Sequence, residues 1–559
     1  MEYLKFDTNS CKDCFTCLRN CPVRAIRFVN QKPQIVSDLC ILCGKCVTKC
    51  PKNAKKVVSH IKEVKELIKN NPNRVALSVA PSFVANFKVG TFSSFKNACE
   101  KLGFSIIEET ARGAYYVTKE YGKLLDSGKY PVLLTSACPS AVTYLCTEYP
   151  EAIKYLAPVV SPMVAHARIL KKEHGEDMKI VFVGPCIAKK KEADQHDEID
   201  YVLTFEELLQ MFNEQNITFE EIAEEEGAYN PARYYPINRG VLKSFGLKVH
   251  DAYDSIAIDG EETIKETLTY IDGLDHLFFE MNMCSGGCIN GPIQLIDDPM
   301  VKSNEVVRQY ARKSFGKDFA EELPFEVDLS WEYKKIESKR KIPTEEEIAN
   351  ILNRIFINNK EEELDCGACG YSSCREKAVA VFNDMAEPTF CLPYLKNKAE
   401  SISNEIIQHT PNGIITINSE GILVDANERS FEYLQIDSSA VGEFYQNYVD
   451  LPELLTAVEE GKNIDSVIVY NDKTDKYFDV SITVVKEHRL AFAIYKDITQ
   501  ETLQEEKMRL LRQEMVEVTD KVINKQMAAV QEIASLLGES TAEAKVALVN
   551  FRNTLKEKK

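Results

Sequence analysis

Two copies of one cysteine pattern near the start of the chain constrain it more than any other feature. Cys11-x2-Cys14-x2-Cys17-x3-Cys21-Pro22 recurs as Cys40-x2-Cys43-x2-Cys46-x3-Cys50-Pro51. Thiolates are soft ligands that suit iron–sulfur chemistry, and the x2 spacing lets one loop reach three corners of a cubic cluster. A pair of structural zinc sites is the alternative. Such sites usually use two x2 pairs rather than three cysteines in step followed by Cys-Pro.

The repeat predicts two 4Fe–4S clusters that exchange ligands. In a bacterial ferredoxin run, three cysteines bind one cluster and the fourth reaches across to the other. Cys11, Cys14, Cys17 and Cys50 are therefore expected to bind one cluster, and Cys40, Cys43, Cys46 and Cys21 the second. We expect residues 1–58 to form this bacterial-type ferredoxin module, which means that the chain handles electrons.

The composition indicates a large protein of a reducing compartment. A length of 559 residues allows about four domains. The net charge of −18 argues against a nucleic-acid partner, which would require a basic face. The start is not a signal peptide and no apolar run reaches membrane-spanning length, so we expect a cytoplasmic protein with no membrane partner.

The 18 cysteines then point to metal ligands rather than disulfides. Cys99 and Cys146, which lie outside every motif, are expected to be buried small hydrophobic residues.

Short apolar runs alternate with helical patterns between residues 73 and 328. The runs are Val75–Val79, Val132–Leu134, Ile180–Val183 and Leu277–Phe279. This alternation predicts an α/β domain with parallel strands. Before this domain, the charged amphipathic stretch Lys55–Lys69 is expected to form a linking helix.

Three of these apolar runs are followed by a cysteine. Cys138 follows Val132–Leu134, Cys186 follows Ile180–Val183, and Cys284 follows the last run, with Cys288 just beyond it. Sites in open α/β sheets form beyond the carboxyl ends of strands, so these four thiolates are expected to converge in one crevice. Gly286 and Gly287 would let the backbone approach a cofactor closely.

The cysteine segments also resemble a known family. Thr135-Ser-Ala-Cys138-Pro-Ser140, Gly184-Pro-Cys186 and Met283-Cys284-Ser-Gly-Gly-Cys288 resemble the three H-cluster signatures of iron-only (FeFe) hydrogenases, and residues 1–58 resemble that family's ferredoxin module. The resemblance implies a two-lobed α/β H-cluster domain over residues 73–328, with a 4Fe–4S cluster on Cys138, Cys186, Cys284 and Cys288. It further implies that Cys288 bridges to a di-iron unit that carries CO, cyanide and an azadithiolate.

Two charged residues match the same family. Lys189 matches the lysine that hydrogen-bonds a cyanide ligand, and Glu192 matches the glutamate after it. An ammonium group near a bound anion is what a negatively charged cofactor requires. The alternative for Lys189 is a solvated lysine within the run Ala188–Lys191.

Several positions depart from the family pattern. Ala137 stands where catalytic members carry a cysteine that relays protons to the di-iron unit, and a methyl group can neither donate nor accept a proton. Gly184 and Asn282 replace methionines: the first loss is expected to open space, and the second places an amide beside the di-iron unit. The third signature ends in Gly291-Pro292 rather than a glycine run, and Glu120 is the candidate for the outer proton relay. We therefore expect cofactor binding with slow turnover.

A further cysteine group lies within residues 343–396. Thr344-x-x-Glu347 after Pro343 predicts a capped helix through Ile355. Cys366-x2-Cys369-x4-Cys374 and Cys391 then resemble the four-cysteine iron–sulfur domain of carbon monoxide dehydrogenase/acetyl-CoA synthase systems. This resemblance implies a third 4Fe–4S cluster. Zinc is the alternative, because the spacing is less diagnostic than the ferredoxin run.

Residues 401–498 resemble a PAS domain. The similarity rests on Pro411-Asn-Gly-Ile-Ile415, Gly421-Ile-Leu-Val-Asp-Ala-Asn427 and Asp497-Ile-Thr499. Val480–Val485 and Leu490–Tyr495 are expected to pair as strands. The region contains no cysteine, which excludes a flavin–cysteinyl photoadduct. His409 and His488 are expected to be surface or packing residues rather than haem ligands.

From residue 499 to 559 the chain is expected to be a helical tail. Its apolar positions repeat as a coiled-coil seam at Met508, Leu511, Met515, Val518 and Val522. The seam then shifts to Ile523, Met527, Val530, Ala534 and Leu537, and Gly538 is expected to close the helix. Such a seam predicts a homodimer, although a helix packed on its own PAS domain would leave the same pattern.

Three functions fit this organisation. The first is an FeFe hydrogenase-type oxidoreductase that reacts slowly and reversibly with H2 and senses it. It would pass electrons through the cubane clusters and signal through the PAS domain and coiled coil to a kinase or phosphatase, and it resembles the sensory subfamily of these hydrogenases. The second is an ordinary hydrogenase that exchanges electrons with a redox carrier such as ferredoxin and uses another proton route. The third is a hydrogenase-like iron–sulfur interaction protein without the di-iron unit.

Overall fold

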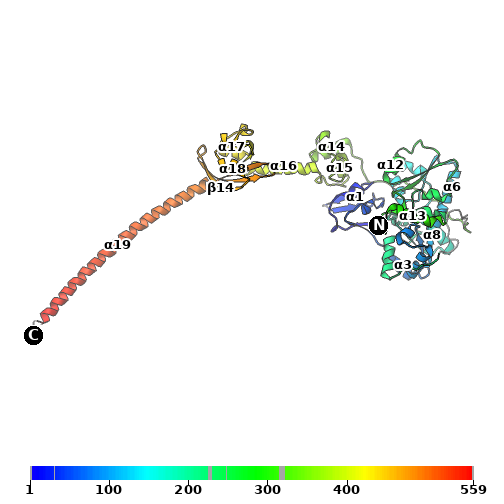
Figure 1. Ribbon diagram of the computed structural model, residues 1–559, viewed down its shortest axis with the longest axis horizontal. Coiled ribbons are helices and arrows are strands. Elements are labelled where there is room, and N and C mark those ends of the chain that lie inside the picture. Colours follow the sequence, from blue (N-terminus) through cyan, green and yellow to red (C-terminus); the bar gives the residue numbers. More distant parts are fainter. Residues whose placement is uncertain are drawn as a thin grey trace. The chain divides into compact units, whose positions relative to one another are not determined.

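The computed structural model describes residues 3–29, 32–223, 230–246, 249–296, 298–313 and 322–556. The chain separates into the units Met1–Leu395 and Lys396–Lys559, which are described in turn (Figure 1). The expected regions 1–58, 73–328 and 499–559 each include residues outside the described ranges. Among the described residues, no helix is both long enough and apolar enough to cross a membrane.

The N-terminal module is closed by strands at its two ends. β1 (Leu4–Phe6) pairs antiparallel with β4 (Lys55–Val57), and β2 (Ile26–Val29) pairs with β3 (Lys32–Ile35). One short helix follows each cysteine loop: α1 (Thr16–Arg19) and α2 (Lys45–Thr48). The prediction of one linking helix over Lys55–Lys69 is wrong, because its first three residues are held by β1. The helix, α3 (Ile61–Asn70), begins only after His60.

Two parallel sheets form the next region. The first has the order β6-β5-β8-β9 and the second the order β10-β11-β7. Their bounds are β5 (Val75–Val79), β6 (Ile106–Glu109), β7 (Val132–Leu134), β8 (Lys179–Gly184), β9 (Tyr201–Thr204), β10 (Asp254–Asp259) and β11 (Leu277–Asn282). All pairings in both sheets are parallel, so the α/β prediction is confirmed, and the four apolar runs are β5, β7, β8 and β11. The strands that the sequence did not predict, β6, β9 and β10, all lie at sheet edges.

Helices cover both sheets and bury an apolar core around them. They are α4 (Phe83–Phe87), α5 (Phe92–Lys101), α6 (Ala111–Asp126), α7 (Pro139–Glu148), α8 (Pro162–His174), α9 (Ala188–Ala193), α10 (Phe205–Glu214), α11 (Gly240–Ser244), α12 (Glu261–Thr269) and α13 (Met300–Arg312). Short 3-10 turns lie at Pro150–Tyr155, Pro231–Tyr234 and Cys288–Asn290. The core between the first sheet and its helices is built largely from phenylalanine, leucine and valine.

The third part of this unit is small. It contains α14 (Glu345–Arg354), α15 (Cys374–Phe382) and the start of α16 (Leu392–His409), with a 3-10 turn at Lys360–Glu362. The capping box is confirmed: the Thr344 side chain accepts from the Glu347 backbone N–H, and the Glu347 carboxylate accepts from the Thr344 backbone N–H. Ile355 follows as the C-cap, as the motif predicted.

One apolar core joins the three cysteine-bearing parts of the chain. It contains Leu18 and Ile41 from the N-terminal module, Val132 and Phe279 from the second sheet, and Tyr371 from the small third part. Each of these side chains is buried. The cysteine groups are therefore held on a single continuous packing unit rather than on separate modules joined by linkers.

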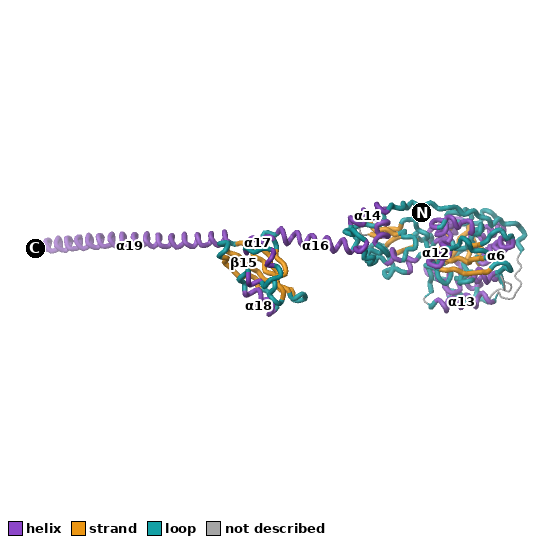
Figure 2. Tube along the Cα trace, turned by 90° about the horizontal axis from the view of Figure 1, so that it is seen from above, coloured by secondary structure: helices purple, strands orange, loops and turns teal. Residues whose placement is uncertain are grey.

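The second unit contains a five-stranded antiparallel sheet in the order β13-β12-β16-β15-β14 (Figure 2). The strands are β12 (Gly413–Asn418), β13 (Leu423–Ala426), β14 (Ile464–Asn471), β15 (Lys476–Val485) and β16 (Leu490–Asp497). α17 (Glu428–Leu434) packs on β12, and α18 (Pro452–Glu460) packs on β15 and β16. Two 3-10 turns lie at Ser438–Ala440 and Tyr445–Asn447. The predicted pairing of Val480–Val485 with Leu490–Tyr495 is confirmed in β15 and β16.

The chain ends in one uninterrupted helix, α19 (Thr499–Lys556), drawn in orange to red in Figure 1. The prediction that Gly538 closes this helix is wrong. A glycine inside a helix costs only about 1 kcal/mol relative to alanine, and the residues after it include strong helix formers such as Ala542, Glu543 and Lys545. The predicted seam residues, among them Met515 and Val530, are exposed on this helix. The coiled coil therefore remains a prediction.

Candidate functional site

The ends of three parallel strands carry the central cysteines. Cys138 lies between β7 and α7, Cys186 follows β8, Cys284 follows β11, and Cys288 begins the 3-10 turn after it. All four line one small cavity of about 40 Å³, here called the thiol cavity. Burial, together with the charge of Cys138, raises the pKa of Cys186 to about 11, and burial likewise raises the pKa values of Cys284 and Cys288. Such thiols ionise when a metal binds, so this donor set fits a metal cluster.

A second cavity of about 90 Å³ adjoins the first, and its walls are mainly alanine, proline and other apolar side chains. We call it the apolar cavity. It shares Ala137, Pro185, Cys186, Lys189, Asn282 and Cys288 with the thiol cavity. The Ser82 hydroxyl, in the wall of the apolar cavity, is buried and has no hydrogen-bond partner among the described residues. An unpartnered buried hydroxyl beside a lysine fits a polar, anionic group bound in an otherwise dry space.

Lys189 lies in the wall of both cavities and is not a solvated lysine. Its side chain is 11% exposed. Its ammonium group donates to Ser161 Oγ at 2.9 Å and to Glu192 Oε2 at 2.7 Å, and it lies 3.5 Å from the Ala137 carbonyl oxygen. Glu192 lines neither cavity, so its position is that of a counter-ion that orients Lys189. The neighbouring Lys190 is also buried and pairs with Glu207.

The structure corrects the expected effect of Gly184. A Cβ at this position would lie 2.8 Å from Cε1 of Phe182 and 3.1 Å from Cβ of Ala80. The space that a larger side chain would occupy is therefore filled by the Phe182 ring, and Gly184 opens no space. This compensation lies two residues away on the same strand, where only the fold shows that the ring turns toward the glycine.

Asn282 is linked to a buried carboxyl group that sequence reasoning missed. Its side-chain amide donates to Glu280 Oε1 at 3.1 Å. Glu280 is fully buried and accepts from the backbone N–H groups of Gly240 and Leu242. Burial raises the pKa of Glu280 to about 7, against the partial stabilisation that these N–H groups give its ionised form. The available signal was a single charged residue in the otherwise apolar or uncharged strand β11.

The glycines of the last signature make room for neighbouring parts of the protein. Gly286 and Gly287 have positive φ angles of 83° and 92°. A Cβ at Gly287 would lie 2.6 Å from the Pro236 carbonyl oxygen, so its missing side chain makes room for this neighbouring loop. That these glycines also let the backbone approach a cofactor stays a prediction. Pro292 packs against Gly44 of the N-terminal module, where any Cβ would collide with the proline ring.

In the N-terminal module, cysteines of the two repeat copies lie near one another, while the crossed assignment of ligands stays a prediction. Cys46 is close enough to Cys43, Cys40 and Cys21 for their charges to raise its pKa, although burial is the larger cause. In the other group, Lys55 hydrogen-bonds both Cys17 and Cys50. Cys43 also lines the thiol cavity, which brings one of these groups directly against the central site.

The third cysteine group forms its own cavity. Cys366, Cys369, Cys374 and Cys391 all line it, together with the buried Lys377. Burial lowers the pKa of Lys377 and raises that of Cys374 to about 11. A cation beside four convergent thiols favours a cluster of net negative charge.

The remaining residues singled out in the sequence are two buried cysteines and one glutamate that lies outside both cavities. Cys99 and Cys146 are buried in apolar surroundings, as expected. Glu120 pairs with Lys123 at 2.6 Å on the outer side of α6 and lines neither cavity, so it is not placed to hand protons to the site. Tyr121, next to it, is buried instead, and its hydroxyl accepts from the Ser136 backbone N–H at 3.0 Å, one residue before Ala137.

Three family models match parts of the chain. Residues 73–292 match "Iron only hydrogenase large subunit, C-terminal domain", residues 3–65 match "4Fe-4S dicluster domain", and residues 362–393 match a model described as an Fe-S cluster.

Curated relatives agree with the largest of these matches. Iron hydrogenase 1 of Clostridium pasteurianum is 26% identical over 361 residues, covering 45% of this chain and 63% of the relative. The periplasmic iron hydrogenase large subunit of Nitratidesulfovibrio vulgaris is 26% identical, covering 52% of this chain and 86% of the relative. Nuclear prelamin A recognition factor of Xenopus laevis is 24% identical, covering 45% of this chain and 73% of the relative. Residues 73–292, which contain all four cysteines of the thiol cavity, are thus similar to the C-terminal domain of the iron-only hydrogenase large subunit.

Proposed function

We propose that this protein binds an H-cluster, reacts slowly and reversibly with H2, and reports the result as a hydrogen or redox sensor. The reaction is H2 to two protons and two electrons. The observation that carries the proposal is the wall shared by the two cavities, in which Cys288 and Lys189 are retained while Ala137 can move no proton. Binding residues are kept and the usual last step of proton transfer is lost, and that combination suits a sensor better than a fast enzyme.

Specific residues would hold the cofactor. Cys138, Cys186, Cys284 and Cys288 are the ligands we assign to its 4Fe–4S part. When bound, the di-iron part supplies the chemistry that splits H2 and stores its electrons. Lys189 presents a positive charge to the apolar cavity, and the Ser82 hydroxyl offers a hydrogen bond there. The alanine and proline walls exclude water, which strengthens both interactions.

The electrons require a path away from this site. Cysteines of three groups belong to one apolar core or pack against it, including Cys138, Cys43, Cys21, Cys17 and Cys369. We assign two 4Fe–4S clusters to the N-terminal cysteines and one to Cys366, Cys369, Cys374 and Cys391. In this scheme electrons pass from the central site through the N-terminal clusters to the third cluster, or to a soluble carrier such as ferredoxin.

The second unit would turn redox state into a signal. We assign residues 401–498 to a PAS domain, and the order of its five strands, with α17 and α18 packed on the sheet, supports that assignment. α19 begins two residues after the last strand, and its apolar residues are exposed along its length. We propose that two copies of the chain pair along α19 and act on a downstream kinase or phosphatase.

Infrared spectroscopy of the protein matured anaerobically with its di-iron unit tests this proposal. Carbonyl and cyanide bands under argon that shift under H2 would support a complete and responsive H-cluster, and a low rate of H2 evolution would then favour sensing over catalysis. A high rate would instead favour a ferredoxin-linked hydrogenase. An absence of bands would mean that the cubane site exists without its di-iron partner, and that the protein acts through interaction alone.

A further inference from the structure

A line of polar side chains crosses the apolar core beside the apolar cavity. It starts at Thr110, which lies in the cavity wall and whose hydroxyl lies 2.7 Å from Ser78 Oγ. Ser78 Oγ lies 2.8 Å from His166 Nδ1. His166 Nε2 in turn lies 3.1 Å from Glu108 Oε2. Four residues therefore join the cavity wall to a carboxylate through three consecutive hydrogen bonds.

The fold explains why these residues meet. Ser78 on β5 and Glu108 on β6 are register partners in the parallel sheet, so their side chains emerge side by side on one face. α8 crosses that face and places the fully buried His166 ring between them. Gly113 lets α6 press onto α8, because a Cβ there would lie 2.6 Å from the His166 backbone nitrogen. Thr110 precedes α6 but its side chain does not cap the helix, which leaves its hydroxyl to Ser78.

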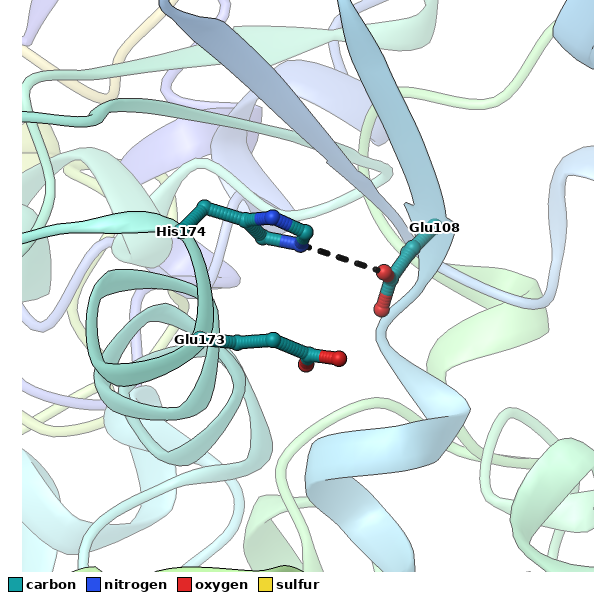
Figure 3. Close-up of side chains that lie close together, drawn as sticks. All are labelled: Glu108, Glu173 and His174. Carbon is teal, nitrogen blue, oxygen red and sulfur yellow. Dashed lines mark ion pairs between the residues drawn. The ribbon is translucent and has the colours of Figure 1, made fainter.

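The outer end of this line reaches a charged cluster near the surface. Figure 3 shows Glu108 at the end of its strand facing Glu173 and His174 on α8. Arg112 pairs with Glu108 at 3.0 Å and with Glu173 at 2.6 Å, and His174 Nε2 lies 3.9 Å from Glu108. The four side chains of this charged cluster are partly exposed, whereas the His166 ring behind them is fully buried. Two carboxylates and a histidine can bind a metal ion, but the Arg112 guanidinium already neutralises both carboxylates here.

Each member of the line can both accept and donate a proton. A hydroxyl does so by rotation, and a neutral imidazole carries a donor on one nitrogen and an acceptor on the other. Burial alone would raise the pKa of Glu108, but the interaction with His166 and the Arg112 guanidinium lower it to about 2. The carboxylate is therefore ionised at rest and can accept the hydrogen bond of His166 Nε2, and a proton that reaches it is readily released to water.

We propose that Thr110, Ser78, His166 and Glu108 conduct protons between the apolar cavity and solvent, in place of the relay that is interrupted at Ala137. A proton that reaches the Thr110 hydroxyl displaces one to Ser78. Ser78 passes its own to His166 Nδ1, His166 Nε2 releases one to Glu108, and the partly exposed Glu108 releases it to water. Each hydroxyl and the imidazole end with as many protons as they began with, and no electrons move. The proposal rests on the proposed function, because only a site that reacts with H2 needs this route.

Ser78→Ala tests the route, since it removes one hydroxyl and almost no volume. Ser78→Thr restores the hydroxyl on the same strand. Ser303→Ala is the matched control, because Ser303 is also buried, lies on α13, and belongs to neither cavity nor to the line. Each matured protein is first normalised by its infrared carbonyl bands. The rate of exchange between H2 and D2O is then measured across pH.

We expect Ser78→Ala to slow the exchange by about 100-fold at unchanged carbonyl intensity, the low end of the range for loss of a proton-transfer group. Ser78→Thr should recover most of the rate, and Ser303→Ala should match the wild type. Equal rates in Ser78→Ala and Ser303→Ala would overturn the proposal. So would a loss that Ser78→Thr does not recover, because that loss would be structural.

A second readout does not depend on the di-iron unit. In protein that lacks this unit, labelled with nitrogen-15 in its histidine rings, Ser78→Ala should change the Nδ1 shift of His166, and Ser303→Ala should not. An unchanged shift would disprove the hydrogen-bond line itself. If the wild type shows no infrared response to H2 while this shift does change, the proposed function fails. The hydrogen-bonded line would then be present but would have no role in proton transfer to H2 chemistry.

Discussion

Glu280→Gln should remove a pH dependence that the buried carboxyl group imposes on stability. The pKa of Glu280 rises from its ordinary value of 4.5 to about 7 in the folded protein, mainly through burial. Between these values the folded state binds more protons than the unfolded state, so the free energy of unfolding falls as pH rises. At about 1.4 kcal/mol per pKa unit, the loss between pH 5 and pH 8 amounts to about 2.5 kcal/mol.

Glutamine has the same shape and does not titrate, so the variant should lack this loss. Its single oxygen can accept from only one of the two backbone N–H groups, those of Gly240 and Leu242, that donate to the carboxyl oxygens of Glu280. Any fixed cost of the replaced hydrogen bonds is the same at both pH values and cancels in the comparison. The variant should therefore gain about 2 to 3 kcal/mol on the wild type between pH 5 and pH 8.

Trp331 supplies the assay. It is the only tryptophan of the chain, and its ring lies 4.2 Å from that of His196 in the same unit as Glu280. Urea unfolding followed by its fluorescence, under anaerobic conditions at pH 5 and pH 8, reports the free energy of unfolding of this unit. A difference between variant and wild type that is equal at both pH values would refute the reasoning, since it would mean that Glu280 titrates normally in the fold.

The remaining predictions concern the metal sites, their packing and the tail. Ala137→Cys should raise H2 evolution by restoring a proton donor to the cavity wall; no gain would mean that this position does not limit turnover. Gly184→Met should destabilise the protein by about 1–3 kcal/mol in thermal unfolding, and Phe182→Ala in the same chain should relieve most of that loss; an unchanged midpoint for the single variant would contradict the packing described for Phe182. Cys374→Ser should remove about four iron atoms per chain in metal analysis, whereas loss of zinc at constant iron would replace the cluster assignment. Removal of residues 499–559 should convert a dimer to a monomer in analytical ultracentrifugation, and an unchanged mass would show that α19 is not the contact between copies.

The candidate metal ligands could be identified from the sequence because the spacing of such ligands is local. The size of a cluster fixes the spacing of its ligands along a loop. The sequence alone therefore identifies the cysteines from Cys11 to Cys50 and those after β7, β8 and β11. The buried strands β5 and β8 are equally readable, since continuous apolar runs occur where both sheet faces are covered. The edge strands β6 and β10 mix polar with apolar residues, and for that reason periodicity alone did not identify them.

The positions that could not be predicted depend on contacts between distant parts of the chain. The sequence indicated that Gly184 leaves an empty space, and only the structure shows that the Phe182 ring fills it. Glu280 looked like one polar residue in a strand, and only its burial beneath Asn282 makes it a titrating group near neutral pH. Ser78, His166 and Glu108 are each unremarkable in the sequence and lie far apart in it. Strand register and one helix crossing bring them into a line.

The apolar core that joins the three cysteine-bearing parts also bears on how long the protein survives in air. Leu18, Ile41 and Tyr371 are buried only while the loops that carry the neighbouring cysteines keep their shape. Oxidative loss of one cluster would release its loop and expose this shared core to water. We expect damage at any one of these metal sites to make the whole first unit prone to aggregation and proteolysis. A molecule that has lost one of its proposed clusters would then be degraded, and would not persist in a form that signals never or always.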